Sequence, residues 1–261
     1  DAMPVELAIQ PSTLFSFLAV LARVSGVFAF TNIPGFRQGP GAAKVVFSLL
    51  FTLALMPLWP ALPDSSPSLG TVLGWLAAEA LFGLSVGLLL TIVIEAFLLM
   101  AQVISLQSGL SYASAVDPTS LADSGAIALT ANLTAGLLLF STGLHRQIIL
   151  ALARSLEVLP PGSFILRDSM AQEVVRFSGT IFSTGLRLAL PIMAFLFMLD
   201  IALSLLGRIN PGVQLFTLSF PVKILVALLI LTQLLPLFPS AFERLGSQCM
   251  EHVYGLLPAA F

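Results

Sequence analysis

The chain has 261 residues, of which 57% are hydrophobic and 9% charged, and its formal net charge at pH 7 is −2. An ordinary soluble domain carries about 25% charged residues, so this composition predicts an integral membrane protein, or a chain that buries its surface against other apolar chains. The near-neutral charge gives no electrostatic case for nucleic-acid binding, and the single cysteine, Cys249, excludes an internal disulfide and a cysteine-cluster metal site.

Two apolar segments are predicted near the start of the chain. Residues 1–11 contain acids but no Lys or Arg, which is the wrong flank for a cleaved secretory signal. A bilayer core about 30 Å thick needs roughly 20 helical residues, and residues 14–31, interrupted only by Arg23, form a candidate span. A Gly/Pro-rich turn then leads to a shorter span, residues 45–59, whose Trp59 suits a membrane interface.

The longest weakly charged segment, residues 71–106, is about twice as long as a single span needs. Its small residues let helices approach closely in membranes. Two alternatives stay open: one long helix, or a helix broken near Gly83 and Gly87. Glu79 and Glu95 would face directions about 160° apart on a straight helix, so they cannot pair with each other there. We expect these carboxylates to bond to neighbouring subunits or loops.

The stretch at residues 107–125, QSGLSYASAVDPTSLADSG, separates this segment from the next apolar one. It is rich in small residues and serines, has one aromatic residue, Tyr112, and lacks Lys and Arg. Asp117 and Pro118 form a turn-starting pair, and small polar residues at this density do not continue a lipid-facing helix. A plain exposed connector is one interpretation. The other is a pore-blocking loop, because such a loop packs into a narrow space and still moves.

The second half of the chain alternates between apolar and polar stretches. Its apolar segments are residues 126–144, 177–206 and 214–236. Residues 145–176, between the first two of these segments, are polar, and residues 240–254 have the pattern of an amphipathic helix. The chain therefore contains about six apolar segments, all helical, without a strand alternation. The predicted fold is all-α, a polytopic membrane protein of long helical hairpins.

Six ionisable residues interrupt the apolar segments. They are Arg23, Glu79, Glu95, Arg187, Asp200 and Lys223. Each costs at least about 2.5 kcal/mol in lipid, so each should be paired or face water. One pairing follows from chain geometry. If Pro211 marks the apex of a hairpin, Asp200 before it and Lys223 after it lie side by side on antiparallel helices, which predicts an ion pair; the alternative is that each faces a separate partner.

Signatures of enzymes are missing from the sequence. There is no HExxH, P-loop or G-x-S-x-G pattern, and His145 and His252 lie far apart in polar stretches. No catalytic residue, cofactor or metal is therefore expected. A secondary transporter remains an alternative, with the carboxylates of Glu79, Glu95 and Asp200 as proton or cation sites.

Two motifs carry a resemblance to a known family. Residues 186–223 contain Ala-Leu-Pro at 189–191, L-x-x-R-x-x-P at 205–211 and Ser-Phe-Pro-Val-Lys at 219–223. Residues 107–118 match the pattern Q-x-G-L-S-[FY]-A-x-x-[VM]-D-P. The chain thus resembles the FliR/SctT family, the R-type subunit of the type III protein export gate, essentially from end to end. The flagellar branch is favoured over the virulence injectisome branch by overall similarity.

The resemblance implies a non-enzymatic channel subunit in the bacterial inner membrane, at the flagellar basal body. It implies P-type and Q-type export-gate subunits as partners, together with the large export-gate and switch subunits, membrane lipid and unfolded secreted substrates. It also implies a P-like part at residues 1–125, ending in the pore loop, and a Q-like part at 126–261, within one integrated domain. The hairpin motif residues carried over are Arg208, Pro211, Phe220 and Pro221.

In this family the loop that corresponds to residues 110–123 plugs the closed pore. The matching positions here are Gly109, Leu110, Ser111, Tyr112, Val116, Asp117 and Pro118. Ala115 departs from the pattern, because many relatives place a second bulky aromatic residue there. The resemblance then implies either a less tight plug or sealing by Tyr112 and methionines of partner subunits. The rival to this plug is an assembly scaffold without a gating part.

Overall fold

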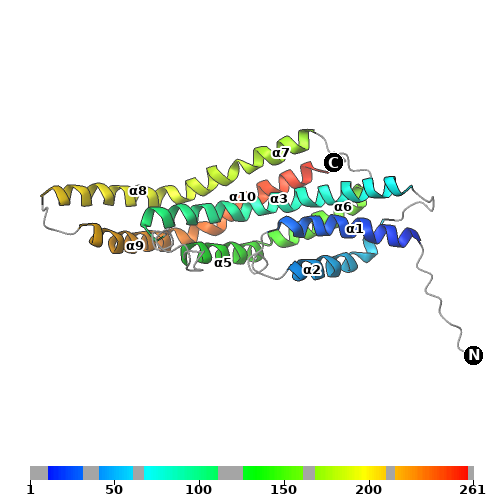
Figure 1. The fold of residues 1–261 in the computed structure, drawn as a ribbon, viewed down its shortest axis with the longest axis horizontal. Helices are drawn as coiled ribbons and strands as arrows, with labels where there is room; N and C mark the ends of the chain where they lie inside the picture. Colours follow the sequence, from blue (N-terminus) through cyan, green and yellow to red (C-terminus); the bar gives the residue numbers. More distant parts are fainter. Residues whose placement is uncertain are drawn as a thin grey trace, which may run out of the picture. The chain divides into compact units, whose positions relative to one another are not determined.

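The computed structural model describes residues 11–31, 41–60, 68–110, 126–160, 168–209 and 215–257. In these ranges the chain is all-α, as predicted (Figure 1). The N-terminal helices are α1 (Pro11–Phe30), α2 (Gly41–Ala54), the short 3-10 helix η1 (Met56–Leu58) and α3 (Leu69–Ser108). The others are α5 (Ala126–Ser141), α6 (Leu144–Val158), α7 (Asp168–Ser178), α8 (Thr180–Ile209), α9 (Leu215–Leu234), the 3-10 helix η2 (Leu235–Leu237) and α10 (Phe238–Gly255).

Helix α3 decides one alternative that the sequence left open. It is a single helix of 40 residues that continues through Gly83 and Gly87. At about 1.5 Å per residue it is about 60 Å long, which is twice the thickness of a bilayer core.

Four helices in the described residues are long and apolar enough to cross a membrane. They lie at Ser12–Phe30, Leu69–Ser108, Val174–Ile209 and Ser219–Gly255. The pair α5 and α6 passes the same test only together, and is bent by 60° between Ser141 and Leu144. The six apolar segments of the sequence thus correspond to four long helices, this bent pair and α2, whose 14 residues are too few to span a bilayer alone.

The helices group into two compact units, each built from segments that alternate along the chain. The first unit comprises Asp1–Thr91, His145–Arg176 and Gln248–Phe261, and the second comprises Ile92–Leu144 and Phe177–Ser247. Because this grouping follows packing rather than chain order, it does not bear on the division at residue 125, which stays a prediction.

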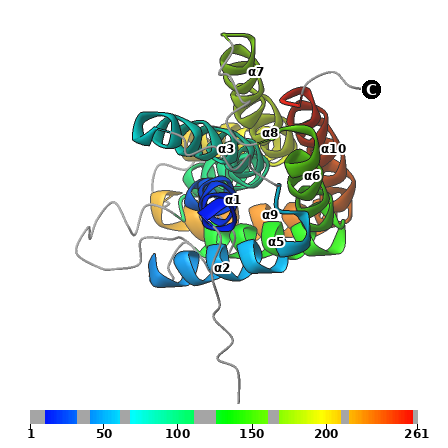
Figure 2. The same cartoon turned by 90° about the vertical axis from the view of Figure 1, so that its right-hand side faces the viewer.

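In the first unit, α1 packs against α2 and α3. Helices α1 and α2 lie side by side (Figures 1 and 2), with the rings of Phe28 and Phe51 5.4 Å apart between centroids. The approach of α1 to α3 depends on glycine. A Cβ on Gly26 would lie 2.6 Å from the carbonyl oxygen of Ala80, and a Cβ on Gly83 would collide with the carbonyl oxygen of Arg23. Only residues without a side chain allow these backbones to meet so closely.

In the second unit, the same principle holds where α8 meets α3. A Cβ on Gly185 would lie 2.8 Å from the carbonyl oxygen of Ala96. The next residue of α3, Phe97, packs its ring against those of Phe238 and Phe242 on α10, with centroids 5.9 and 5.3 Å apart. Helices α8 and α9 pack against each other in antiparallel orientation (Figure 1).

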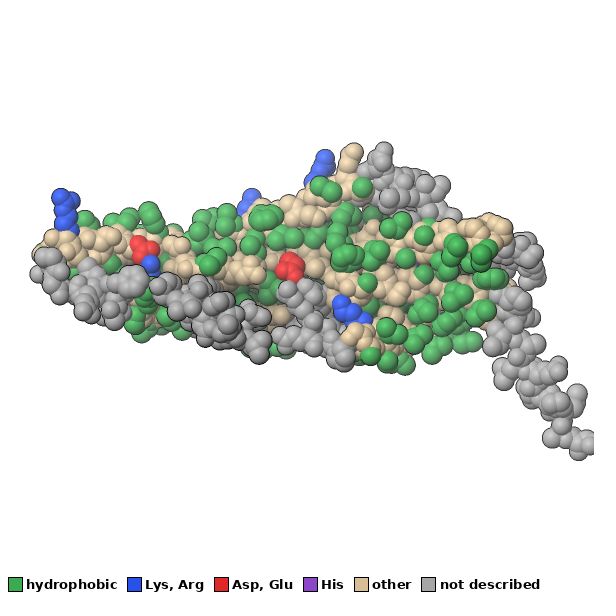
Figure 3. Space-filling view, viewed as in Figure 1, with side chains coloured by type: hydrophobic (Ala, Val, Ile, Leu, Met, Phe, Trp, Pro, Cys, Tyr) green, Lys and Arg blue, Asp and Glu red, His purple; other side chains and the backbone are tan. Residues whose placement is uncertain are grey.

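Much of the surface is apolar. In the described part of the face shown in Figure 3, hydrophobic side chains are spread over much of the surface and only a few charged ones lie between them. On α8 the exposed large side chains include Phe182, Leu186, Leu190, Phe195, Phe197 and Met198. Helices with such faces are stable against lipid or other apolar protein surfaces rather than in water.

Candidate functional site

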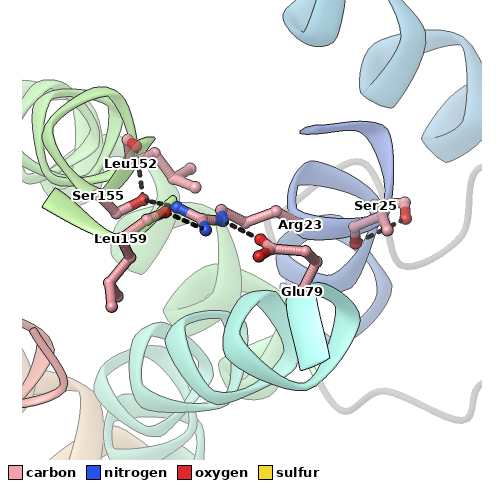
Figure 4. A network of polar contacts seen from close by, with 7 residues as sticks. Arg23, Ser25, Glu79, Leu152, Ser155 and Leu159 are labelled. Carbon is pink, nitrogen blue, oxygen red and sulfur yellow. Dashed lines mark hydrogen bonds and ion pairs between the residues drawn. The ribbon is translucent and has the colours of Figure 1, made fainter. Parts of the chain in front are cut away.

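The largest fully buried side chain in the described residues is that of Arg23 on α1. Its side chain is 0% exposed, and that of its partner Glu79 on α3 is 1% exposed. The Nε of Arg23 donates to Oε2 of Glu79 at 2.5 Å, Nη1 donates to the hydroxyl of Ser155 at 2.9 Å, and Nη2 donates to the carbonyl of Leu159 at 3.0 Å. Figure 4 shows these contacts, which join α1, α3 and the end of α6 within the first unit.

Each member of this network is positioned by a neighbour. The hydroxyl of Ser155 accepts from Arg23 and donates to the carbonyl of Leu152 at 2.7 Å. The ring of Phe82, one helical turn after Glu79 on α3, lies 5.0 Å from the guanidinium carbon of Arg23, a cation–π distance. A buried charge stabilises a fold only when it is paired and hydrogen-bonded in this way. The arrangement is therefore suited to fixing three elements together.

The sequence did not identify this network. The sequence required a partner or water for Arg23 and expected Glu79 to bond to a neighbouring subunit or a loop. It did not predict that the two residues pair with each other, which the structure shows. The two residues are 56 positions apart, so no hairpin register relates them. Ser155 and Leu159 were missed as well, because a serine and a carbonyl near the end of a polar helix carry no distinguishing signal.

The structure brings Asp200 and Lys223 together. The Nζ of Lys223 on α9 pairs with Oδ1 of Asp200 on α8, in the register that a hairpin centred near Pro211 predicts. The side chains are 17% exposed for Lys223 and 37% for Asp200. The contribution of this pair to assembly stays a prediction, and Pro211 itself lies outside the described residues.

The start of the predicted pore loop is described at Gly109 and Leu110, both half-buried. Gly109 follows the last residue of α3 with a φ of +84°, and its N–H donates to the carbonyl of Leu106 at 3.2 Å. A Cβ there would collide with Cδ1 of Phe220 on α9 and lie 2.7 Å from Cε1 of the same ring. The remaining loop residues that the sequence selected, Ser111, Tyr112, Ala115, Val116, Asp117 and Pro118, lie outside the described residues.

The other predicted site residues are dispersed. Glu95 on α3 is half-buried, whereas Arg187 and Arg208 on α8 and Pro221 on α9 are exposed. The transporter alternative needs carboxylates that take up and release ions, yet Glu79 and Asp200 are each held by a basic side chain. Among the described residues there is no group of three His, Cys, Asp or Glu side chains that could hold a metal ion.

Comparisons with known proteins agree with the motifs. Residues 14–249 match the bacterial export proteins, family 1. The chain is 30% identical over 229 residues to the flagellar biosynthetic protein FliR of Escherichia coli (strain K12), covering 87% of each chain. It is 30% identical to FliR of Pectobacterium carotovorum subsp. carotovorum, covering 92% of this chain and 90% of that protein. With FliR of Caulobacter vibrioides it shares 29% identity, over 81% of this chain and 85% of that protein.

Proposed function

The chain belongs to the bacterial export proteins, family 1, with FliR proteins among its relatives, and we propose that it is a core subunit of the flagellar type III protein export gate. The observation that supports this most is the extent of the similarity, because it covers 87% of both this chain and the E. coli FliR protein. The apolar helices add a membrane location, which we assign to the bacterial inner membrane at the flagellar basal body.

In this proposal the chain forms part of a channel wall with P-type and Q-type subunits. The α8–α9 hairpin supports such a role, because its outward face carries large apolar side chains that need a covering surface. The large export-gate and switch subunits are further partners, and unfolded flagellar proteins are the substrates. No catalytic step is assigned to the chain; it shapes the channel through which substrates pass.

The pore loop is the gating part of the proposal. The segment that begins at Gly109 and Leu110 would fill the lumen of the closed gate, with Tyr112 as its bulky side chain. We expect deletion of residues 111–115 to raise the leakage of ions or small molecules across membranes that contain the assembled gate. A seal that stays intact at equal amounts of assembled gate would contradict the plug and favour a scaffold without a gating part.

Co-purification tests the assignment as a whole. A tagged chain expressed with P-type and Q-type subunits should be recovered in mild detergent as a stable hetero-oligomer, which native mass spectrometry would resolve. The same chain expressed alone should be unstable or inert. A well-behaved monomer or homodimer that is indifferent to those subunits would contradict the proposal and favour the transporter alternative.

Loss of the chain from its source bacterium separates the two branches of export gates. We expect its removal to abolish the export of hook and filament proteins, and therefore swimming, and a plasmid copy to restore both. Normal swimming combined with the loss of effector secretion would instead assign the chain to a virulence injectisome.

A further inference from the structure

The two sequence motifs that indicate the family meet at one contact in the structure. Gly109 belongs to the central motif and Phe220 to the motif near residue 223, and the ring of Phe220 lies directly against the backbone of Gly109. The space that a Cβ on Gly109 would occupy is filled by the ring edge, with Cε1 at 2.7 Å from the Cβ position. Both residues are in the second unit.

The backbone at Gly109 does not by itself require this contact. Gly109 ends α3 in the left-handed conformation, which glycine adopts without the steric cost that other residues meet. Gly143 has a similar φ of +74°, but a Cβ there would meet no heavy atom within 4 Å. The turn therefore explains a glycine at both positions, whereas only Gly109 also accommodates a ring.

The ring is itself held in place by its helix. Phe220 lies on α9 one helical turn before Lys223, and Lys223 pairs with Asp200 on α8. The α8–α9 hairpin thus presents the ring at a defined point, and the end of α3 rests on it.

We propose that Phe220 is a positioning residue whose ring, seated on the bare backbone of Gly109, fixes the point at which the chain leaves α3. This inference rests on the proposed function for its consequence. The segment that starts there is the proposed pore plug, so the α8–α9 hairpin sets where the plug begins.

The contact is tested first by coupling between the two residues in the assembled gate. Gly109→Ala should reduce the yield of assembled gate by about tenfold, since the new Cβ meets both the left-handed backbone and the ring. In a Phe220→Ala background the ring is gone, so the further loss caused by Gly109→Ala should shrink to that caused by Gly143→Ala. Gly143→Ala is the matched control, because it carries the backbone strain without a clash. Equal losses for Gly109→Ala and Gly143→Ala in both backgrounds would overturn the contact.

The positioning role is tested by leakage, measured per assembled gate. Phe220→Ala should leak and Phe220→Tyr should seal, because tyrosine keeps the ring edge that meets Gly109. One outcome would overturn the positioning role but leave the plug in place. In it, Gly109 and Phe220 are coupled and deletion of residues 111–115 causes leakage, but the Phe220→Ala gate does not leak. If the two residues are coupled but no variant leaks, including the deletion of residues 111–115, the contact between Gly109 and Phe220 is supported. The plug is then overturned, and with it the role of the α8–α9 hairpin in setting where the plug begins.

Discussion

Two ion pairs inside apolar segments show how differently one chain can accommodate charge. Arg23 and Glu79 in the first unit are almost fully buried and share a network of three hydrogen bonds from the guanidinium. Asp200 and Lys223 in the second unit keep part of their surface exposed. Breaking the first pair leaves an uncompensated buried charge, whereas breaking the second leaves a charge that the chain itself buries only in part.

The difference also separates two kinds of information in the sequence. The partly exposed pair, Asp200 and Lys223, could be predicted from one turn and the rise of two helices, because the residues lie at similar distances on either side of Pro211. The buried pair joins helices that are not connected by a short turn. The most buried interaction is therefore the one that chain order did not reveal.

The largest effect is expected from Glu79→Ala, which removes the carboxylate that binds Arg23 and leaves the guanidinium buried. Loss of one partner of a buried pair costs about 3–5 kcal/mol. The thermal midpoint of unfolding of the gate in detergent, with the yield of assembled complex, measures this. The double variant Arg23→Met with Glu79→Met should recover much of the loss. If Glu79→Ala is as stable as the parent protein, the Arg23–Glu79 pair does not contribute to stability.

A similar but smaller loss is expected from Gly83→Ala, because its Cβ would collide with the carbonyl oxygen of Arg23 and push α1 away from α3. Overpacking of this kind costs about 1–3 kcal/mol. Gly74→Ala in the same helix is the matched control, since a Cβ there meets nothing within 4 Å; it should be neutral or stabilising. Equal thermal midpoints for the two variants would contradict the close approach of α1 and α3.

Ser155→Ala sharpens the comparison by removing one hydrogen bond to Arg23 without removing a charge. A hydrogen bond to a charged group contributes about 1.5–3 kcal/mol, and the remaining bonds to Glu79 and Leu159 should keep the loss near the lower value. The unfolding midpoint measures it. In a background that already carries Arg23→Met the same change should cost little, and an unchanged cost there would place the role of Ser155 elsewhere.

The smallest effect is expected at the partly exposed pair of Asp200 and Lys223. Asp200→Asn and Lys223→Met should each lower the yield of assembled gate about as much as the double variant does, because either change removes the same interaction. Since the Asp200 side chain is 37% exposed, we expect a coupling free energy of about 1 kcal/mol or less. Strictly additive losses would show that each residue faces a separate partner.

Particular residues show where prediction from the sequence ended. Apolar length identified α1, α3, α8 and α9, because about 20 apolar residues in a helix have few alternatives to a membrane span. Apolar length was a poorer guide at residues 45–59, which were predicted to form a short span. They contain most of α2 and the 3-10 helix η1, and α2 is too short to cross a bilayer alone. Glu79 was expected to bond to neighbouring subunits or loops, because its position on α3 excludes a pair with Glu95 but does not show which helix of the chain lies beside it. The loop of residues 111–125 lies outside the described residues, so its role stays a prediction.

The sequence by itself determined the all-helical membrane character, the family and the register of the α8–α9 hairpin, since each depends on composition, on motifs or on residues close to one turn. The tertiary structure decided which distant helix faces meet. Arg23 reaches Glu79 because glycines bring α1 against α3, and Phe220 reaches Gly109 because the end of α3 lies against α9. Such contacts depend on packing in three dimensions, where the absence of a Cβ at a glycine lets two backbones, or a backbone and a ring, come into contact.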